Sequence, residues 1–296
     1  MPWIKLITSS TTENTEALSD LISDAGAAAV TIEDNADQPL FEPPPGETPL
    51  WQANRITGLF EADTDMKAVV ERLQSNWTAT PFPEHRIEIL EDKDWVRAWM
   101  DDFKPMQFGK RLWVVPSWHQ PPEPDAANLM LDPGLAFGTG THPTTSLCLQ
   151  WLDAQNMEGK TAIDYGCGSG VLAVAALLLG AEKVWGIDND PQALTASKDN
   201  AGRNGIDLEK FSLHYPRETP TLEVDFIVAN ILAAPLIELA PSICALLKPE
   251  GHIALSGILD HQAESVMEAY RPWIEFEPMA TQEEWVRLNG KKVNNH

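Results

Sequence analysis

The chain has 296 residues, of which 43% are hydrophobic, and this length suits two domains better than one small one. Its formal net charge of −23 comes from acids along the whole chain. That charge disfavours DNA or RNA as the main partner, because phosphate contacts need clustered Lys and Arg, and it suits a basic protein partner instead.

The three cysteines are Cys148, Cys167 and Cys244. Their number is odd and no pair has metal-ligand spacing, so we expect reduced thiols and no metal site. The N-terminal residues lack the apolar core of a signal peptide, and the longest apolar run, around 171–179, is too short to cross a bilayer. We therefore expect a soluble, cytoplasmic protein.

Residues 1–90 predict a small α+β domain. Its expected strands are 3–7, 28–33, 54–60 and 86–90, and its expected helices are 15–24 and 66–73. This βαββαβ order resembles the ferredoxin-like modules. RNA-binding domains share that fold, but their sheet aromatics and basic surface are missing here. We interpret 1–90 as a protein-recognition domain, with the acidic, proline-rich stretch 34–50 as an exposed loop.

Residues 91–105 are expected to form a linker that contains one short helix over 94–103. Trp95 and Trp99 are four residues apart on that helix, and we interpret them as packing anchors. A bend in this linker would swing the first domain over the second one, 106–296, which is our hypothesis for its function.

The second domain is expected to begin with strands at 112–118 and 128–132, followed by a glycine-rich loop over 133–142. We expect this loop to be a lid that delivers Phe137 and His142, although a plain connecting loop is the alternative. Pro143 suits a first helical position, so Thr145 is expected in the first turn of a helix that runs to about 155.

Residues 161–170 carry the strongest motif of the chain. An apolar strand with Asp164 near its end is followed by Gly166, Gly168 and Gly170, and then by an apolar helix over 171–179. This pattern predicts a buried strand, a tight turn and a helix whose N-terminus faces the crevice where open α/β sheets bind nucleotide-like ligands.

The spacing of these glycines restricts the chemical class of ligand that we expect. The third glycine comes one residue too early for a dinucleotide fingerprint, no Lys or Arg is present to meet phosphate, and Asp164 would repel it. The ligand should therefore be cationic or zwitterionic and free of phosphate. Asp188 ends a second strand, 183–188, about twenty residues later, where an acid binds ribose hydroxyls; the alternative is a helix cap before Pro191.

The remaining pattern predicts a mostly parallel sheet of seven strands with helices on both faces and one antiparallel strand inserted by the last hairpin. Its further strands are expected at 211–214, 223–230, 252–257, 275–281 and 284–288, and its further helices at 192–204, 234–247 and 264–273. The strand tips should bring Gly166, Asp188 and Asn230 together at one edge. Asn230 could also be only a turn residue.

The segment from Asp164 to Gly170 resembles motif I of the class I S-adenosyl-L-methionine-dependent methyltransferases, which have a Rossmann-like domain. Asn230 stands where amino-group methyltransferases keep an Asn or Asp. The sequence here is Asn-Ile-Leu-Ala and lacks the Pro-Pro-Tyr wall, which disfavours a flipped nucleobase as substrate. We expect Asn230 to be catalytic by accepting amine N–H bonds and aiming the lone pair of the nitrogen.

Together with the small first domain and the His-Pro-Thr-Thr segment that begins at His142, these motifs resemble the family of methyltransferases that act on ribosomal protein L11. The resemblance covers the whole chain. It implies methylation of lysine ε-amines and of the N-terminal α-amine of that basic protein, up to trimethylation. It also implies that the first domain grips the substrate and that the linker reorients it. Separately, we expect the protein to be a monomer.

By motif, the resemblance puts cofactor contacts on eight residues: Thr145, Gly166, Asp188, Asn230, Asp164, Gly168, Phe137 and His142. Three alternatives remain from the sequence alone: a methyltransferase that acts on RNA or a small molecule, a nicotinamide oxidoreductase, and a non-catalytic cofactor-binding adaptor.

Overall fold

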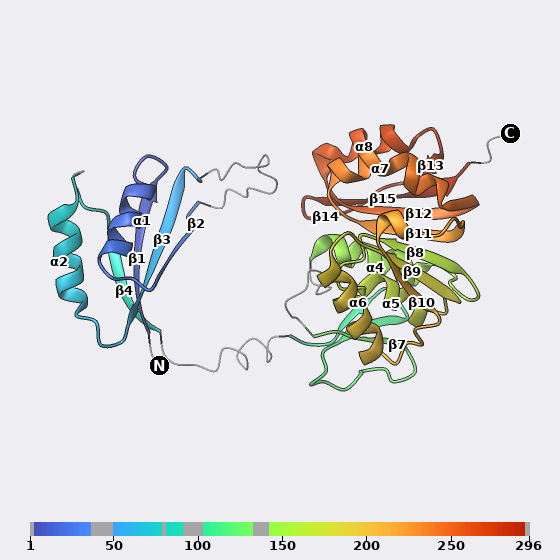
Figure 1. The fold of residues 1–296 in the computed structure, drawn as a ribbon, viewed down its shortest axis with the longest axis horizontal. Coiled ribbons are helices and arrows are strands. Elements are labelled where there is room, and N and C mark those ends of the chain that lie inside the picture. Colours follow the sequence, from blue (N-terminus) through green and yellow to red (C-terminus); the bar gives the residue numbers. More distant parts are fainter. Residues whose placement is uncertain (1–2, 37–49, 79–80, 91–102, 133–141, 294–296) are drawn as a thin grey trace. The chain divides into compact units, whose positions relative to one another are not determined.

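The computed structural model describes residues 3–36, 50–78, 81–90, 103–132 and 142–293, which fall in two compact units within 1–100 and 101–296 (Figure 1). The expected loop over 34–50 and the expected linker helix over 94–103 lie largely outside the described residues. Phe137 lies outside them too.

The first unit has the element order expected from the sequence. Its elements are β1 (Trp3–Thr11), α1 (Thr15–Asp24), β2 (Ala29–Asp34), β3 (Ala53–Glu61), α2 (Met66–Asn76) and β4 (His85–Leu90). The strands form one antiparallel sheet in the order β2-β3-β1-β4. Both helices bury one apolar stripe against it, with Leu18 and Ile22 from α1 and Leu73 from α2 in a common core.

The second unit contains one large sheet and one small one. Its strands are β5 (Met106–Phe108), β6 (Leu112–Val115), β7 (Ala127–Met130), β8 (Thr161–Tyr165), β9 (Lys183–Ile187), β10 (Phe211–His214), β11 (Val224–Asn230), β12 (Leu247–Leu259), β13 (Ile274–Phe276), β14 (Ala280–Gln282) and β15 (Trp285–Lys292). Its helices are α4 (Pro143–Ala154), α5 (Val171–Leu178), α6 (Pro191–Arg203), α7 (Ala233–Ala245) and α8 (Ala263–Tyr270), with short 3-10 turns η1 (Pro216–Glu218) and η2 (Asp260–Gln262).

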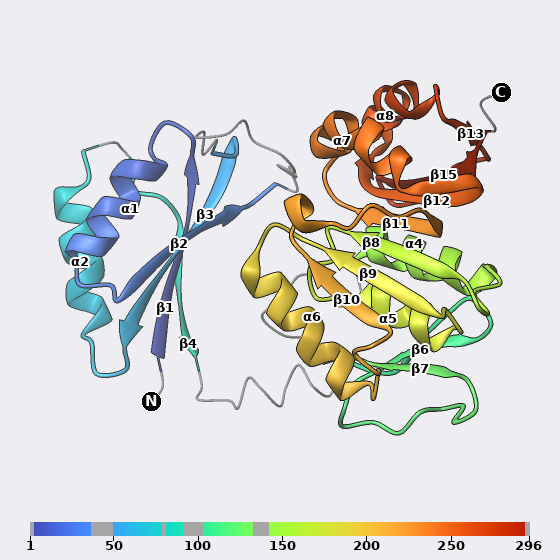
Figure 2. The same cartoon turned by 45° about the vertical axis from the view of Figure 1, so that its right-hand side comes forward.

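The large sheet follows the order β10-β9-β8-β11-β12-β15-β13, and β14 pairs with β15 (Figure 2). The strands from β10 to β12 are parallel, whereas β15 is antiparallel to β12. From β8 the chain runs outward through β9 to β10 and then returns to the other side of β8 as β11. This reversal makes a topological switch point between β8 and β11, where open α/β sheets bind ligands.

Helices cover both faces of the large sheet, as the sequence predicted. Alternate residues of β11 show the two layers: Phe226 and Val228 belong to the core under α4 and α5, while Ile227 and Ala229 belong to the core under α7 and α8. Both faces of the central strands are therefore buried, and only the strand ends meet solvent.

Three expectations about the strands were wrong in detail. The single strand expected over 275–281 is two short strands, β13 and β14, so the sheet has eight strands and not seven. Pro278, which has no amide hydrogen for a ladder bond, lies in the break. The strand expected over 112–118 ends at Val115, just before Pro116, and the short β5 was not expected.

In the described part of the chain, no helix combines the length and the apolar character needed to cross a membrane. The three cysteines are buried free thiols. Within the same described ranges, no three or more His, Cys, Asp or Glu side chains are arranged to hold a metal ion.

Candidate functional site

The strand register brings three of the expected site residues to the same level. Tyr165 of β8 pairs with Ile187 of β9 on one side and with Ala229 of β11 on the other. The next residues along these strands are Gly166, Asp188 and Asn230, so all three lie at the carboxyl edge of neighbouring parallel strands, at the switch point.

The glycine turn after β8 has a backbone that other residues do not adopt easily. The φ angles are 75° at Gly166, 52° at Gly168 and 75° at Gly170. At Gly166 a Cβ would also come within 2.2 Å of the Cγ2 atom of Ile231. The Gly166 amide donates to the Ile187 carbonyl oxygen at 2.7 Å, which ties the turn to the end of β9.

Asp188 is partly exposed, and its side chain hydrogen-bonds to the same glycine turn. Its carboxylate accepts hydrogen bonds from the amide of Gly168 at 2.9 Å and from the amide of Asp190 at 3.0 Å. A carboxylate has about four acceptor positions, so two of them stay available for further donors such as a sugar diol. Asp190 caps α6 through Gln192 at 2.8 Å, so the alternative role for Asp188 as that cap is already filled.

Asp164 behaves differently from Asp188, because its side chain is only 1% exposed. One carboxyl oxygen accepts the amide of Ala173, in the first turn of α5, at 3.0 Å. The other oxygen has no hydrogen-bond partner among the residues that the structure describes. Burial raises the pKa of Asp164 to about 7, and the nearby charge of Asp188 adds to the increase while the Ala173 bond opposes it. Asp164 therefore links the first turn of α5 to β8.

Asn230 is linked to the first turn of α4. Its side-chain amide nitrogen donates to the Thr145 hydroxyl at 3.2 Å, and Thr145 is only 1% exposed. His142 caps α4: its Nδ1 atom lies 2.8 Å from the Thr144 hydroxyl, and its ring makes an edge contact with Trp285 at 5.1 Å. Thr145 thus contacts Asn230 directly, and His142 lies at the same end of α4. The cofactor contacts expected of both residues stay predictions.

Several residues that shape this edge were missed by sequence reasoning. From α6, the Ser197 hydroxyl donates to the Gly168 carbonyl oxygen at 2.9 Å, and the Asn200 amide donates to the Ser169 carbonyl oxygen at 2.8 Å. Ser197 and Asn200 are small polar residues on the otherwise ordinary helix that follows Asp188. Their spacing of three residues on one helix face was the available signal.

The residues at this edge fit S-adenosyl-L-methionine. The turn 166–170 contains no Lys or Arg for a phosphate. Asp188 retains acceptor positions for a ribose, and a helix N-terminus faces the edge. A groove of about 640 Å³ lies elsewhere, beside Lys110 and Leu179, at the opposite end of α5. We assign the site to the strand tips, because the switch point of the sheet and the motif residues Gly166, Asp188 and Asn230 lie there and not at the groove.

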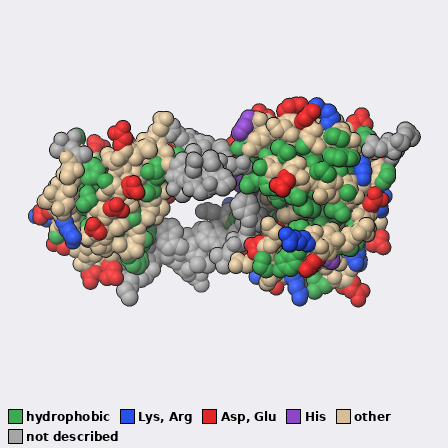
Figure 3. Space-filling model, turned by 45° about the horizontal axis from the view of Figure 1, so that its top comes forward, with side chains coloured by type: hydrophobic (Ala, Val, Ile, Leu, Met, Phe, Trp, Pro, Cys, Tyr) green, Lys and Arg blue, Asp and Glu red, His purple; other side chains and the backbone are tan. Residues whose placement is uncertain are grey.

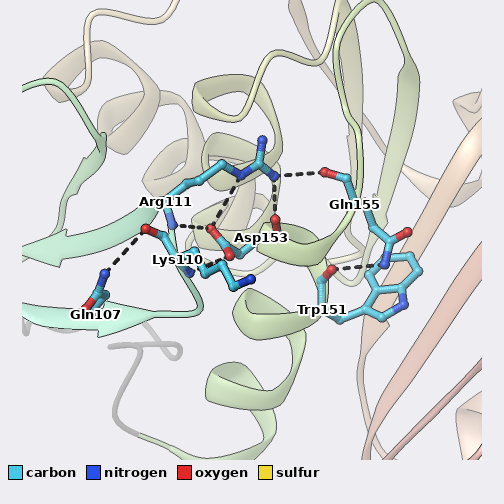
Figure 4. Close-up of polar contacts among 6 residues, drawn as sticks. All are labelled: Gln107, Lys110, Arg111, Trp151, Asp153 and Gln155. Atoms are coloured by element: carbon cyan, nitrogen blue, oxygen red, sulfur yellow. Dashed lines mark hydrogen bonds and ion pairs between the residues drawn. The ribbon is translucent and has the colours of Figure 1, made fainter.

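The far end of α4 is anchored by Asp153 (Figure 4). Its carboxylate, with the residue 5% exposed, accepts the amides of Lys110 at 2.6 Å and Arg111 at 2.8 Å. The Arg111 guanidinium donates to the carbonyl oxygens of Asp153 and Gln155. These bonds fix the β5–β6 turn to the C-terminal end of the helix whose first turn contacts Asn230.

On the face shown in Figure 3, acidic side chains are spread over both units. This distribution agrees with the net charge of −23 along the sequence.

Comparison with known proteins gives consistent matches along the chain. The model of a family described as ribosomal protein L11 methyltransferase (PrmA) matches residues 2–293. A protein of that name from Photorhabdus laumondii is 58% identical over 294 residues, which cover 99% of each chain. Another from Vibrio cholerae is 55% identical over 296 residues, covering 99% of this chain and all of the relative.

A solved structure from Lactobacillus delbrueckii subsp. bulgaricus, described as a ribosomal protein L11 methylase, is similar at 31% identity and a TM-score of 0.57. The match covers 65% of this chain and 100% of that one.

Proposed function

Because the chain belongs to the ribosomal protein L11 methyltransferase family, we propose that it methylates ribosomal protein L11 with S-adenosyl-L-methionine as the donor. The acceptors are lysine ε-amines and the N-terminal α-amine, each up to the trimethylated form. The observation that carries the proposal is the meeting of Gly166, Asp188 and Asn230 at one level of the sheet edge, where Asn230 is tied to Thr145.

In this proposal each residue at the edge has a separate role. Asp188 binds the ribose hydroxyls with the acceptor positions that Gly168 and Asp190 leave. The glycine turn, with Gly166 and Gly168, lets the ligand approach the backbone. Thr145 and His142 border the site from α4, and the proposed contact of Phe137 rests on the sequence. Asp164, which is buried, acts by fixing the N-terminus of α5.

The bound donor supplies a methyl group on a positively charged sulfur, so the leaving group needs no further activation. The protein has to present an uncharged amine in line with that methyl group. A lysine amine with a reference pKa of about 10.4 must first lose a proton, and burial favours the neutral form. The Thr145 contact takes one amide hydrogen of Asn230, and in this proposal the amide oxygen accepts an amine N–H.

The domain assignment is part of the proposal. Residues 1–90 would be a ferredoxin-like substrate-recognition domain, which the element order and the sheet order β2-β3-β1-β4 support. Residues 91–105 would link it to a Rossmann-like methyltransferase domain over 106–296, which the switch point between β8 and β11 supports. We propose a monomer that acts in the cytoplasm, on a basic protein and not on nucleic acid.

The test is intact-mass analysis of purified ribosomal protein L11 after incubation with the enzyme and S-adenosyl-L-methionine. The expected result is a ladder of products that differ by one methylene each. Tritiated methyl groups counted in protein and RNA fractions would distinguish the RNA-directed alternative. An unmodified protein, or label found only in RNA, would contradict the proposal.

Asn230→Ala is the matched variant for the same assay. We expect its turnover to fall by about 100-fold, because misplacing the nucleophile by about 1 Å costs that much. Its dissociation constant for S-adenosyl-L-methionine, measured by calorimetry, should change far less. Unchanged turnover would remove Asn230 from the chemistry.

A further inference from the structure

The end of β12, next to Asn230, is irregular. Asn230 of β11 pairs with Ser256 of β12. On the other side of β12, Leu255 pairs with Leu288 and Ile258 pairs with Val286, so two residues, Ser256 and Gly257, stand opposite one residue of β15. This is a β-bulge, a feature that is over-represented beside active sites because it redirects nearby groups.

Gly257 is the residue of this bulge that no other amino acid replaces easily. Its φ angle is 84°, in the region that L side chains rarely adopt. A Cβ on Gly257 would lie 2.3 Å from the carbonyl oxygen of Ile231 and 2.8 Å from its carbonyl carbon. The missing side chain therefore leaves the space that the backbone directly after Asn230 occupies.

Ile231 is confined from a second direction as well. A Cβ on Gly166 would lie 2.2 Å from the Ile231 Cγ2 atom, so the cofactor turn packs against the Ile231 side chain. Two glycines, one in the turn after β8 and one in β12, thus hold the residue that follows Asn230. A shift of Ile231 would carry Asn230 with it, since the two share a peptide bond.

Ser256 contacts the end of α4 that carries Thr145, the hydrogen-bond partner of the Asn230 side chain. Its hydroxyl is fully buried and lies 3.2 Å from the carbonyl oxygen of Thr144 and 3.3 Å from that of Val286. Thr144 directly precedes Thr145, which accepts the hydrogen bond from the Asn230 amide. Ser256 consequently fixes the helix end against which the Asn230 side chain is oriented.

We propose that the Ser256–Gly257 bulge positions Asn230. Gly257 fixes the backbone position of Asn230 through Ile231, and Ser256 fixes the orientation of the Asn230 side chain through the first turn of α4. The inference rests on the proposed function and adds two residues that act through Asn230 and touch neither substrate nor cofactor. The bulge determines how accurately the acceptor amine is aimed.

The first experiment compares Gly257→Ala with the wild-type enzyme. We expect kcat for ribosomal protein L11 to fall by about 10- to 100-fold, the range expected for a displacement of up to about 1 Å. The dissociation constant for S-adenosyl-L-methionine should change by a smaller factor than kcat, because Ile231 touches the cofactor turn only at Gly166, and Asp188 is on the far side of β8 from β12.

Gly290→Ala is the steric control in the same sheet. A Cβ on Gly290 would lie 2.4 Å from the carbonyl oxygen of Glu275, nearly the same clash as at Gly257, but between β13 and β15. We expect it to lower the melting temperature with kcat unchanged. A fall in kcat as large as that of Gly257→Ala would mean that any disturbance of the sheet has this effect, and it would overturn the proposal.

A double-mutant cycle with Asn230→Ala separates positioning from general damage. If Gly257 acts through Asn230, adding Gly257→Ala to Asn230→Ala lowers kcat less than twofold further. An equal loss in both backgrounds, or no loss in the wild-type background, overturns the proposal. If Gly257→Ala does not fold, Ser256→Ala is carried through the same cycle, with the same outcomes required.

Failure of the proposed function has a different signature. If wild-type enzyme gives no methylated ribosomal protein L11, the proposed function is wrong, whatever the variants do. If the wild type is active and the cycle shows independent effects, only the positioning proposal fails.

Discussion

The buried carboxyl group of Asp164 should make the stability of the folded protein depend on pH. One oxygen accepts a hydrogen bond from the Ala173 amide, and the other has no partner within the described parts of the chain. Burial raises the pKa of Asp164 to about 7 from an ordinary value of 3.8. Between these two values the folded chain holds a proton that the unfolded chain has released. The contribution of Asp164 to stability is therefore fully present below about pH 4, falls as the pH rises to 7, and is flat above it.

Asp164→Asn should remove that pH dependence. The amide keeps an acceptor for Ala173 and carries no charge, so the variant should gain melting temperature relative to the wild type between pH 5 and pH 8. Thermal unfolding of the full-length protein across that range measures the effect. Asp199→Asn, an equal charge change at an exposed position of α6, should follow the wild-type curve. Parallel curves for Asp164→Asn and wild type would show that Asp164 stays ionised throughout.

At the scale of elements, α4 is held at both ends by side chains that a helical pattern does not explain. Asp153 lies in its last turn, where the helix dipole disfavours an acid. Its two hydrogen bonds from the Lys110 and Arg111 amides account for this placement. The ion pair with the half-exposed Arg111 side chain, at 3.8 Å, adds little by comparison.

Asp153→Ala should therefore destabilise the second unit by about 3 kcal/mol, because hydrogen bonds to a buried charged group contribute about 1.5 to 3 kcal/mol each. Arg111→Ala should cost less. Urea unfolding, followed by the fluorescence of Trp151 and its neighbours, compares the two. Equal losses would mean that the guanidinium bonds to the helix end, and not the backbone amides, hold the turn.

Sequence periodicity predicted most elements because their apolar faces are regular. The helix expected over 15–24 and the strand expected over 211–214 have those bounds in the structure. The errors come from local chemistry that periodicity does not register, such as Pro116 and Pro278 at strand ends. The site was predictable where motif residues lie at the carboxyl ends of strands, as Gly166, Asp188 and Asn230 do. Because these strands are parallel neighbours, the three residues lie at the same edge of the sheet.

The supporting residues of the site were not predictable in the same way. Ser197, Ser256 and Gly257 act through contacts between segments that are 26 residues or more apart in the chain. A lone Ser or Gly in a helix or strand gives no pattern, so only the contacts in the folded chain reveal their role. Asp164 illustrates the converse, because its motif position suggested a ligand contact and its 1% exposure favours a structural role.

At the scale of the whole molecule, the net charge of −23 should govern encounter with a basic substrate. Opposite potentials raise association rates by about 10- to 1,000-fold at low salt, and salt screens them. We expect kcat/KM for ribosomal protein L11 to fall at least about fivefold between about 50 and 200 mM salt, while cofactor affinity changes little. Initial rates at several ionic strengths test this, and salt-independent rates would contradict it.

The place of β15 in the large sheet has a consequence for biosynthesis. Among the described strands, Trp285–Lys292 comes last in the chain, yet it lies between β12 and β13 and separates them. A nascent chain can therefore assemble the first unit early, since all strands of that sheet come from residues 3–90. The large sheet stays open until translation has passed Lys292, so methyl transfer must await the synthesis of β15.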